Sequence, residues 1–172
     1  CGDSLAELRP KMKALLPEII DLKADVVGKS LVRTGITHFC LGEQELQLSP
    51  EAIRTLVASK AYIASNVELP FPSSVSTHGT FESNGVRGVI LNVADPSVIA
   101  HIDSAPLLKV NVREPIQAVN EILRIHNKGN SLELCIVVFH VGDSKIVRDI
   151  MSMKDIPQSA IAIDAGHLRR NP

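Results

Sequence analysis

The sequence has no tryptophan, few aromatic residues and only three cysteines among its 172 residues. Aromatic side chains make up 3% of the chain, so the stacked-ring platforms that hold nucleic-acid bases are poorly supplied. No Cys-x-x-Cys pair occurs, which excludes a thiolate zinc knuckle and c-type haem attachment. Three cysteines also make no disulfide framework. Cys40 and Cys135 lie within apolar runs, where we expect buried reduced thiols.

No charge sign dominates the chain, and no hydrophobic run is long. Lysine plus arginine total 18 and aspartate plus glutamate total 19, giving a net charge of −1. A basic nucleic-acid-binding protein is excluded, because phosphate neutralisation requires clustered positive charge. No apolar run approaches the roughly 20 residues of a membrane-spanning helix. With 45% hydrophobic residues, the chain is instead expected to fold around a core, as a single domain over residues 1–172.

Apolar periodicity and turn residues predict alternating helices and strands. We expect helices over 5–20, 27–34, 49–57, 114–127 and 143–153, and strands over 36–41, 62–65, 79–83, 86–93, 107–112, 132–139 and 160–163. Asn84-Gly85 is typical of a type I′ hairpin turn, and residues 94–104 are expected to be a connection. This rhythm is typical of βαβ units. The predicted fold class is therefore α/β, with a mixed, mainly parallel sheet and helices on both faces.

Acidic residues and histidines follow several of the predicted strands. Glu43 follows strand 36–41, His140 follows strand 132–139 and His167 follows strand 160–163, while Asp3 needs one preceding strand to fit the pattern. Ligands of such sheets bind beyond the carboxyl ends of the strands, so these side chains are expected to converge. Carboxylates and imidazoles bind divalent metals, and two such ions can clamp a phosphoryl group and activate water. Taken singly, each residue also fits an ordinary core or turn position.

Six motifs occur in the order in which one enzyme family carries them. They are Gly2-Asp3, HFCLGEQEL at 38–46, the helix from Ser49-Pro50 that leads to ASNV at 64–67, NGVRGVIL at 84–91, VVFHVG at 137–142 and AGHLR at 165–169. Together they resemble the calcineurin-like metallophosphoesterases, in particular the 5′-nucleotidase/UDP-sugar hydrolase branch. The resemblance implies that Asp3 bridges divalent metal ions (Zn, Mn or Fe), that Glu43, His140 and His167 are the other ligands, and that phosphomonoesters or nucleotides are hydrolysed.

Three departures from the family pattern bear on activity. The first strand and its Asp-x-His motif are absent, so we expect a fragment that lacks this strand. Gln44 stands where the family has its catalytic histidine, and an amide cannot donate a proton at neutral pH. Arg169 stands in place of a metal-binding histidine, and its cation would repel a metal. Catalysis would then rest on Gln44 and His140.

Three functional hypotheses stay open. The first is a divergent metal-dependent phosphoesterase that needs more ligands from a preceding segment or a further domain. The second is a non-catalytic binding or interaction domain on the same scaffold, in which Arg169-Arg170 binds a small phosphorylated molecule or another anion. The third is thiol chemistry at Cys1, which could bind a metal as a thiolate. The resemblance implies a periplasmic or cell-surface location, and a mature bacterial lipoprotein also begins with cysteine.

Overall fold

The computed structural model describes residues 22, 25–26, 29–30, 32–43, 45–58, 61–71, 73–100, 108–128 and 132–165. The predicted helix over 5–20 lies outside them, as do Asp3, Gln44, His167 and Arg169. In chain order the elements are β1 (Phe39–Cys40), the 3₁₀ helix η2 (Glu45–Gln47), α2 (Pro50–Ala58), β2 (Tyr62–Ile63), β3 (Val67–Glu68), β4 (Gly79–Ser83), β5 (Val86–Ala94), α3 (Pro96–Ala100), β6 (Asn111–Val112), α4 (Pro115–His126), β7 (Leu134–His140), α5 (Ser144–Met151) and β8 (Ile161–Asp164).

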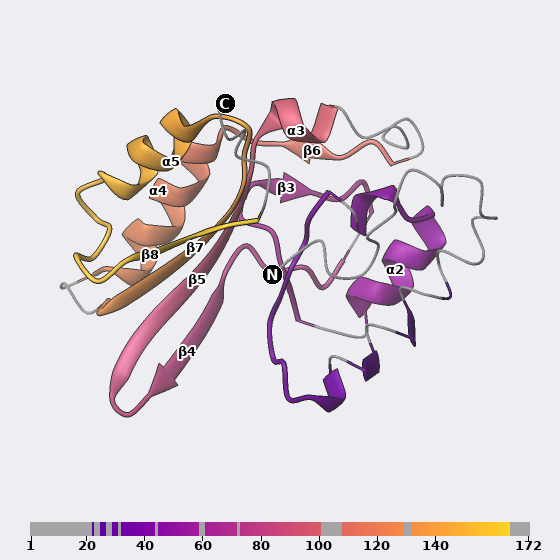
Figure 1. Cartoon of the computed structure of the whole chain (residues 1–172), viewed down its shortest axis with the longest axis horizontal. Coiled ribbons are helices and arrows are strands. Elements are labelled where there is room, and N and C mark those ends of the chain that lie inside the picture. Colours follow the sequence, from indigo (N-terminus) through magenta and orange to yellow (C-terminus); the bar gives the residue numbers. More distant parts are fainter. Residues whose placement is uncertain are drawn as a thin grey trace, which may run out of the picture.

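A four-stranded sheet in the order β4-β5-β7-β8 forms the centre of the structure. Strands β5, β7 and β8 are parallel, and β4 is antiparallel to β5. Helices α4 and α5 lie together along one face of this sheet (Figure 1). One set of alternate residues of β5 and β7, which includes Leu91 and Val137, packs in a buried cluster with Leu123 of α4 and Ile150 of α5. The expected mixed, mainly parallel sheet is confirmed.

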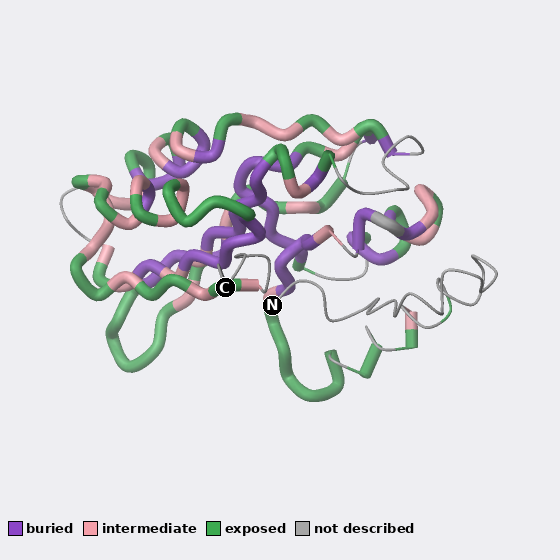
Figure 2. Tube along the Cα trace, turned by 45° about the horizontal axis from the view of Figure 1, so that its top comes forward, coloured by how far each residue is buried: buried purple, intermediate pink, exposed green. Residues whose placement is uncertain are grey.

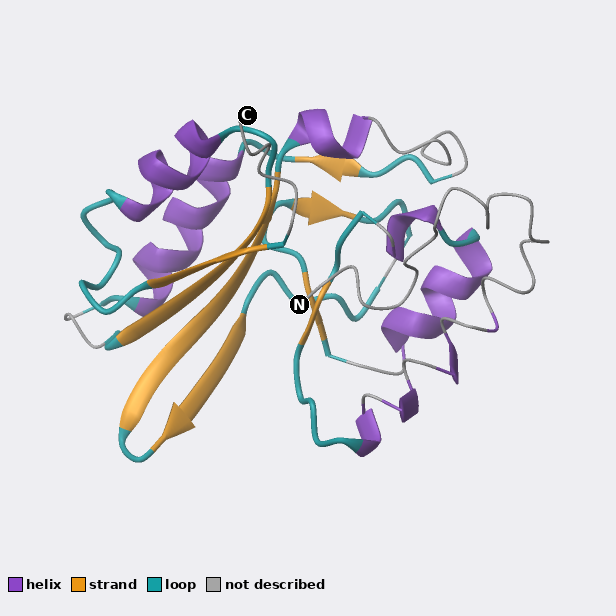
Figure 3. Ribbon diagram, in the orientation of Figure 1, coloured by secondary structure: helices purple, strands orange, loops and turns teal. Residues whose placement is uncertain are grey.

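The opposite side of the sheet carries α2 and two short strand pairs (Figure 3). Strands β1 and β2 pair in parallel, and β3 and β6 pair in an antiparallel manner. A second buried cluster includes Phe39 of β1, Ile53 of α2, Tyr62 of β2 and Ala94 at the end of β5. In Figure 2 the buried backbone runs through the centre, whereas the tip of the β4–β5 hairpin is exposed. The fold therefore has helices on both faces, as the sequence predicts.

Local sequence signals set several element boundaries as expected. The Ser49 hydroxyl accepts a hydrogen bond from the backbone N–H of Ala52, which caps α2. Asp143 caps α5 in the same way, by accepting from the N–H of Lys145. The turn between β4 and β5 has positive φ at both central residues, 51° at Asn84 and 79° at Gly85. These are the angles that a type I′ turn requires, so that prediction is confirmed.

The connection predicted over 94–104 is wrong in part, because residues 96–100 form helix α3. The Asp95 carboxylate accepts a hydrogen bond from the backbone N–H of Ser97 and so caps this helix. Asp95-Pro96 is the same kind of start as Ser49-Pro50, namely a capping residue followed by proline at the first helical position. Five residues are too few to show an apolar period, and for that reason the helix is hard to predict.

Strand β3 was not expected, and β6 is much shorter than the strand predicted over 107–112. The two strands pair only through Val67 with Val112 and Glu68 with Asn111. Strands of two residues have no measurable alternation, because one period of a strand is already two residues. They are defined by the partner that the chain meets in the fold, and sequence patterns carry no such information.

Three buried polar residues, Ser65, Asn66 and Asn92, join β5 to the neighbouring strands, and we call them the polar seam. The Asn92 amide nitrogen donates to the carbonyl oxygens of Leu41, at 2.8 Å, and Ile63, at 2.9 Å. The backbone N–H of Asn92 donates to the Ser65 hydroxyl, and the N–H of Ser65 donates to the carbonyl oxygen of Asn92. Because each sheet supplies the other with hydrogen bonds here, the seam fixes the β1–β2 pair against β5.

Asn66 extends the polar seam to the end of β5. Its amide nitrogen donates to the carbonyl oxygens of Ala94, at 2.7 Å, and Arg113, at 3.0 Å, while its amide oxygen accepts from the N–H of Ala94 at 2.9 Å. One side chain thus satisfies backbone groups that follow it by 28 and 47 residues. The seam holds the ends of β2 and β5 together.

Cys40 and Cys135 are buried thiols, as expected. Burial raises the pKa of Cys135 to about 12. At pH 8 such a thiol would be ionised to about one part in 10⁴, and only the thiolate reacts. In a Cys1→Ser variant, we expect neither buried thiol to react with an aromatic disulfide reagent until denaturant unfolds the chain. Rapid reaction of the native variant would show that the core around β7 is open.

Candidate functional site

The carboxyl ends of three neighbouring strands bring Asp95, His140 and Asp164 to the same edge of the central sheet. Ala94 at the end of β5 is in register with His140 of β7, and Phe139 is in register with Asp164 of β8. The backbone N–H of Asp95 donates to the carbonyl oxygen of His140 at 3.0 Å. Parallel α/β sheets bind their ligands at this edge, so it is where a site is expected.

His140 is completely buried, with 0% of its surface exposed. Its register partner Ala94 belongs to the cluster of β1, α2 and β2, whereas Val137 and Phe139 belong to the cluster of α4 and α5. Because successive residues of a strand point to opposite faces, the His140 imidazole lies on the side of the sheet away from α4 and α5. The placement predicted from the sequence, at the end of the most apolar strand, is confirmed.

Glu43 lies half-buried in the loop that follows β1. The neighbouring Glu45 is buried, with 1% exposed, and its carboxylate accepts a hydrogen bond from the backbone N–H of Gly42 at 2.8 Å. This contact closes the turn in which Glu43 lies. Burial, and secondly the charge of Glu45, raise the pKa of the Tyr62 hydroxyl, which therefore stays protonated.

Two acidic residues at this edge were not among the expected ligands. Asp95, 8% exposed, lies beside the end of β7, and Glu45 is the buried carboxylate of the loop after β1. Asp95 had a signal in the sequence, because it lies at the end of a strand, as His140 does. The only sequence signal for Glu45 is its spacing of three residues from Gly42, which is typical of a side chain that closes its own turn. Both side chains are engaged by backbone N–H groups, and this favours a positioning role.

The sequence predicts that Asp3, Glu43, His140 and His167 meet in one cavity. The structure describes only Glu43 and His140 of this set, while Asp3, His167 and the adjacent Gln44 lie outside the described residues. Among the described residues, no three histidine, cysteine, aspartate or glutamate side chains are grouped so that they could hold a metal ion. The donor types fit Zn, Mn or Fe, because the set offers carboxylate oxygens and imidazole nitrogens. Such a centre requires Asp3 and His167 in addition to the two described residues.

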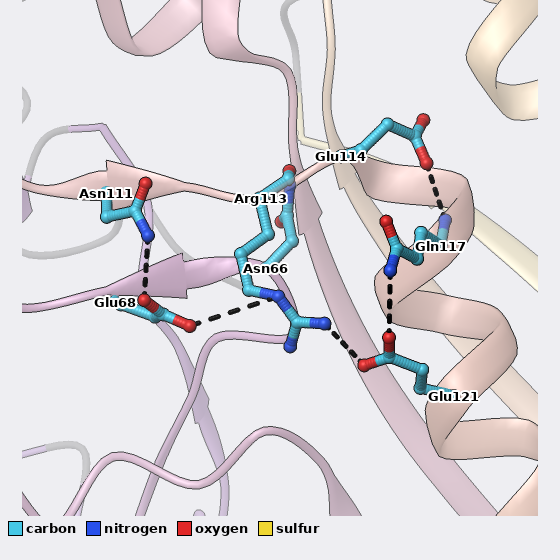
Figure 4. A network of polar contacts seen from close by, with 7 residues as sticks. All are labelled: Asn66, Glu68, Asn111, Arg113, Glu114, Gln117 and Glu121. Atoms are coloured by element: carbon cyan, nitrogen blue, oxygen red, sulfur yellow. Dashed lines mark hydrogen bonds and ion pairs between the residues drawn. The ribbon is translucent and has the colours of Figure 1, made fainter.

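A surface network around Arg113 is a further cluster of charged residues, but it has a structural role (Figure 4). The Arg113 guanidinium lies 3.9 Å from a Glu68 carboxylate oxygen and donates to Glu121 of α4. This hydrogen bond is the main cause that lowers the pKa of Glu121. Asn111 and Gln117 donate to the two glutamates. Exposed ion pairs contribute little to stability, so the network mainly orients β3 and β6 toward α4.

No helix among the described residues is long and apolar enough to cross a membrane. No family model matches the sequence, and no curated protein matches it. Solved structures do match. The sulfate thiohydrolase SoxB of Thermus thermophilus, in complex with glycerol, superposes with a TM-score of 0.63 at 8% identity, over 83% of this chain and 30% of SoxB. The NAD nucleotidase NadN of Haemophilus influenzae gives 0.59 at 15% identity, over 80% of this chain and 28% of NadN.

The likeness to both enzymes covers most of this chain but less than a third of either neighbour, 30% and 28% of their lengths. At such low identity it is a likeness of fold. It agrees with the mixed α/β fold class expected from the sequence. The chain thus has the mixed α/β fold found in part of a sulfate thiohydrolase and part of a NAD nucleotidase.

Proposed function

We propose that the chain is a divergent metal-dependent phosphoesterase domain of the 5′-nucleotidase type, which acts on phosphomonoesters or nucleotides. The observation that carries the proposal is the buried His140 at the carboxyl end of β7, beside the ends of β5 and β8. It lies in the motif VVFHVG, which resembles a metal-binding motif of that family. The shared fold with an enzyme named as a NAD nucleotidase supports the substrate class.

In this proposal Asp3, Glu43, His140 and His167 would together hold the divalent metal. A bound divalent ion supplies Lewis-acid polarisation of a phosphoryl oxygen and a more acidic bound water. The half-buried Glu43 is held in a turn that Glu45 closes, which limits the positions its carboxylate can take. Gln44 can donate a hydrogen bond to the substrate but no proton to the leaving group, so we expect slow turnover.

Removal of the buried imidazole tests the proposal. The His140→Gln variant is expected to lose Mn²⁺ binding and the Mn²⁺-dependent hydrolysis of p-nitrophenyl phosphate and nucleoside monophosphates. Loss of a residue that hydrogen-bonds to a metal ligand typically lowers metal affinity by about 10- to 100-fold. Loss of the ligand itself is expected to lower the affinity at least as much. Equilibrium dialysis and phosphate release measure the two effects, and circular dichroism checks that the variant is folded.

His38→Gln is the matched control, because His38 is a half-buried histidine beside Gly79 and is not one of the proposed ligands. This variant should bind Mn²⁺ as the unchanged chain does. If the unchanged chain binds no metal above background and shows no turnover with Mn²⁺, the proposed activity is wrong.

The second candidate function is a non-catalytic anion-binding domain, and the replacements at Gln44 and Arg169 favour it. Here Arg169-Arg170 would bind a phosphate group without any metal, because guanidinium groups bind phosphate oxygens in pairs. Titration with a nucleoside monophosphate in the presence of a chelator distinguishes the two candidates. Binding that persists there and is lost in Arg169→Ala supports the second. A periplasmic or cell-surface location stays a prediction.

A further inference from the structure

Two histidines that are 48 residues apart in the sequence meet on the side of the sheet that carries α4. His78 directly precedes β4, and His126 is the last residue of α4. Their Nε2 atoms are 2.7 Å apart, and the ring centroids are separated by 4.2 Å with the planes at 64°. Both residues are half-buried. The two rings therefore bring the same nitrogen within hydrogen-bonding distance of each other.

The contact of His78 with Thr77 suits a metal ligand. The Nδ1 atom of His78 lies 3.0 Å from the Thr77 hydroxyl. If Nδ1–H donates to this oxygen, Nε2 carries a lone pair directed at His126. Histidines that bind metals usually donate their other ring N–H to a nearby acceptor in this way, which fixes the tautomer and the ring orientation.

The surroundings of the pair leave room for an ion with its water ligands. A cavity of about 350 Å³ beside His126 is lined by Thr80, Glu82 and Arg87 of the β4–β5 hairpin. Glu82 and Arg87 are cross-strand partners in this hairpin. Burial, and secondly the charge of His126, lower the pKa of His78, which favours the neutral ring that a metal needs.

We propose that His78 and His126 form a second metal site, which binds a borderline divalent ion such as Zn²⁺ with water completing the coordination. With Zn–N bonds of about 2.0–2.1 Å, a tetrahedral ion holds two nitrogens roughly 3.3 Å apart. The present separation of 2.7 Å therefore has to open by about 0.6 Å, which small ring rotations allow at half-buried positions. The bound ion ties the start of β4 to the end of α4.

This site is separate from the one proposed at the carboxyl edge. His126 belongs to α4, which packs on the face formed by Leu91 and Val137, whereas His140 lies on the opposite face of the same sheet. Imidazole nitrogens favour Zn²⁺ over Mn²⁺, since affinity for a nitrogen site rises along the first-row metals. The two proposals can therefore fail independently.

Titration of the full chain with Zn²⁺ alone, at pH 7.5 and in a Cys1→Ser background that removes the thiol at Cys1, tests the site. Loss of a residue that hydrogen-bonds to a metal ligand typically lowers metal affinity by about 10- to 100-fold. We expect His78→Gln and His126→Gln, which remove the ligands themselves, each to weaken Zn²⁺ binding at least as much. Thr77→Ala should weaken it by about 10-fold, the lower end of the same range. His38→Gln, the matched control at a half-buried histidine outside both proposed sites, should retain the binding.

Nitrogen NMR of the imidazoles distinguishes a metal site from a simple hydrogen bond between two neutral rings. On addition of Zn²⁺, we expect both Nε2 resonances to shift together and to reach a limit at one equivalent. If neither resonance moves at millimolar Zn²⁺, or if binding is lost only in His140→Gln, the site does not exist and the pair is a hydrogen bond that shares one proton.

Discussion

A Gln44→His variant is expected to hydrolyse phosphomonoesters about 10²–10⁴-fold faster than the unchanged chain, which is the usual contribution of a general acid. An imidazole near its ordinary pKa can protonate the leaving alkoxide, whereas the glutamine amide cannot. The gain should appear only with added Mn²⁺, because in the proposed function a bound metal would position the phosphoryl group. Initial rates of phosphate release across pH 5–9 measure it, and the variant should gain a pH-dependent step that the unchanged chain lacks.

Gln47→His is the matched control for this gain of activity. Gln47 is the last residue of the 3₁₀ helix η2, three positions further along the same segment, and it is not a proposed catalytic position. The same substitution there should leave the rate unchanged. Equal rates for Gln44→His and the unchanged chain, with Mn²⁺ bound to both, would rule out a general-acid role at this position and favour the anion-binding alternative.

Asn92→Leu is expected to lower the free energy of unfolding by about 3 kcal/mol, because a buried polar group left without its partner costs roughly 1–3 kcal/mol. The substitution removes the amide that donates to the carbonyl oxygens of Leu41 and Ile63, and leucine can donate to neither. The total stability of a domain is only about 5–15 kcal/mol, so a large part of it would be lost. Urea unfolding followed by circular dichroism measures the change.

Asn111→Leu is the matched control, because Asn111 is an exposed residue of β6 whose amide donates only to the Glu68 side chain. Exposed substitutions of this kind usually stay within about 0.5 kcal/mol. A similar small effect at Asn92 would show that the polar seam does not hold the β1–β2 pair against β5. The site at the carboxyl edge would then lack the support that positions the loop after β1.

The parts of the fold that sequence patterns predict are those with strong local signals. The apolar run of β7, the Asn84-Gly85 turn and the capping residues Ser49 and Asp143 each dictate local structure without help from distant residues. Helix α3 and strands β3 and β6 are too short to show a period, and their existence depends on contacts made after the chain has folded.

In the candidate site, too, some features follow from local sequence signals and others depend on how distant segments pack. That His140 ends a buried strand could be predicted, since an apolar run followed by a polar residue indicates a strand that ends at the ligand-binding edge. The burial of Glu45 and the contact between His78 and His126 could not, because each depends on how separate segments pack. Sequence periodicity assigns residues to faces, but it does not specify which side chains from different elements come within hydrogen-bonding distance.

Asp3, Glu43, His140 and His167 are proposed to surround a metal ion at the carboxyl edge of the sheet. Crystals grown with Mn²⁺, with diffraction measured on both sides of the manganese absorption edge, test it directly. We predict an anomalous peak on the side of β7 away from α4, with oxygen and imidazole nitrogen ligands at about 2.0–2.6 Å. The proposal would be contradicted if the four side chains lay on different sides of the molecule. It would also be contradicted if no manganese peak appeared beside His140.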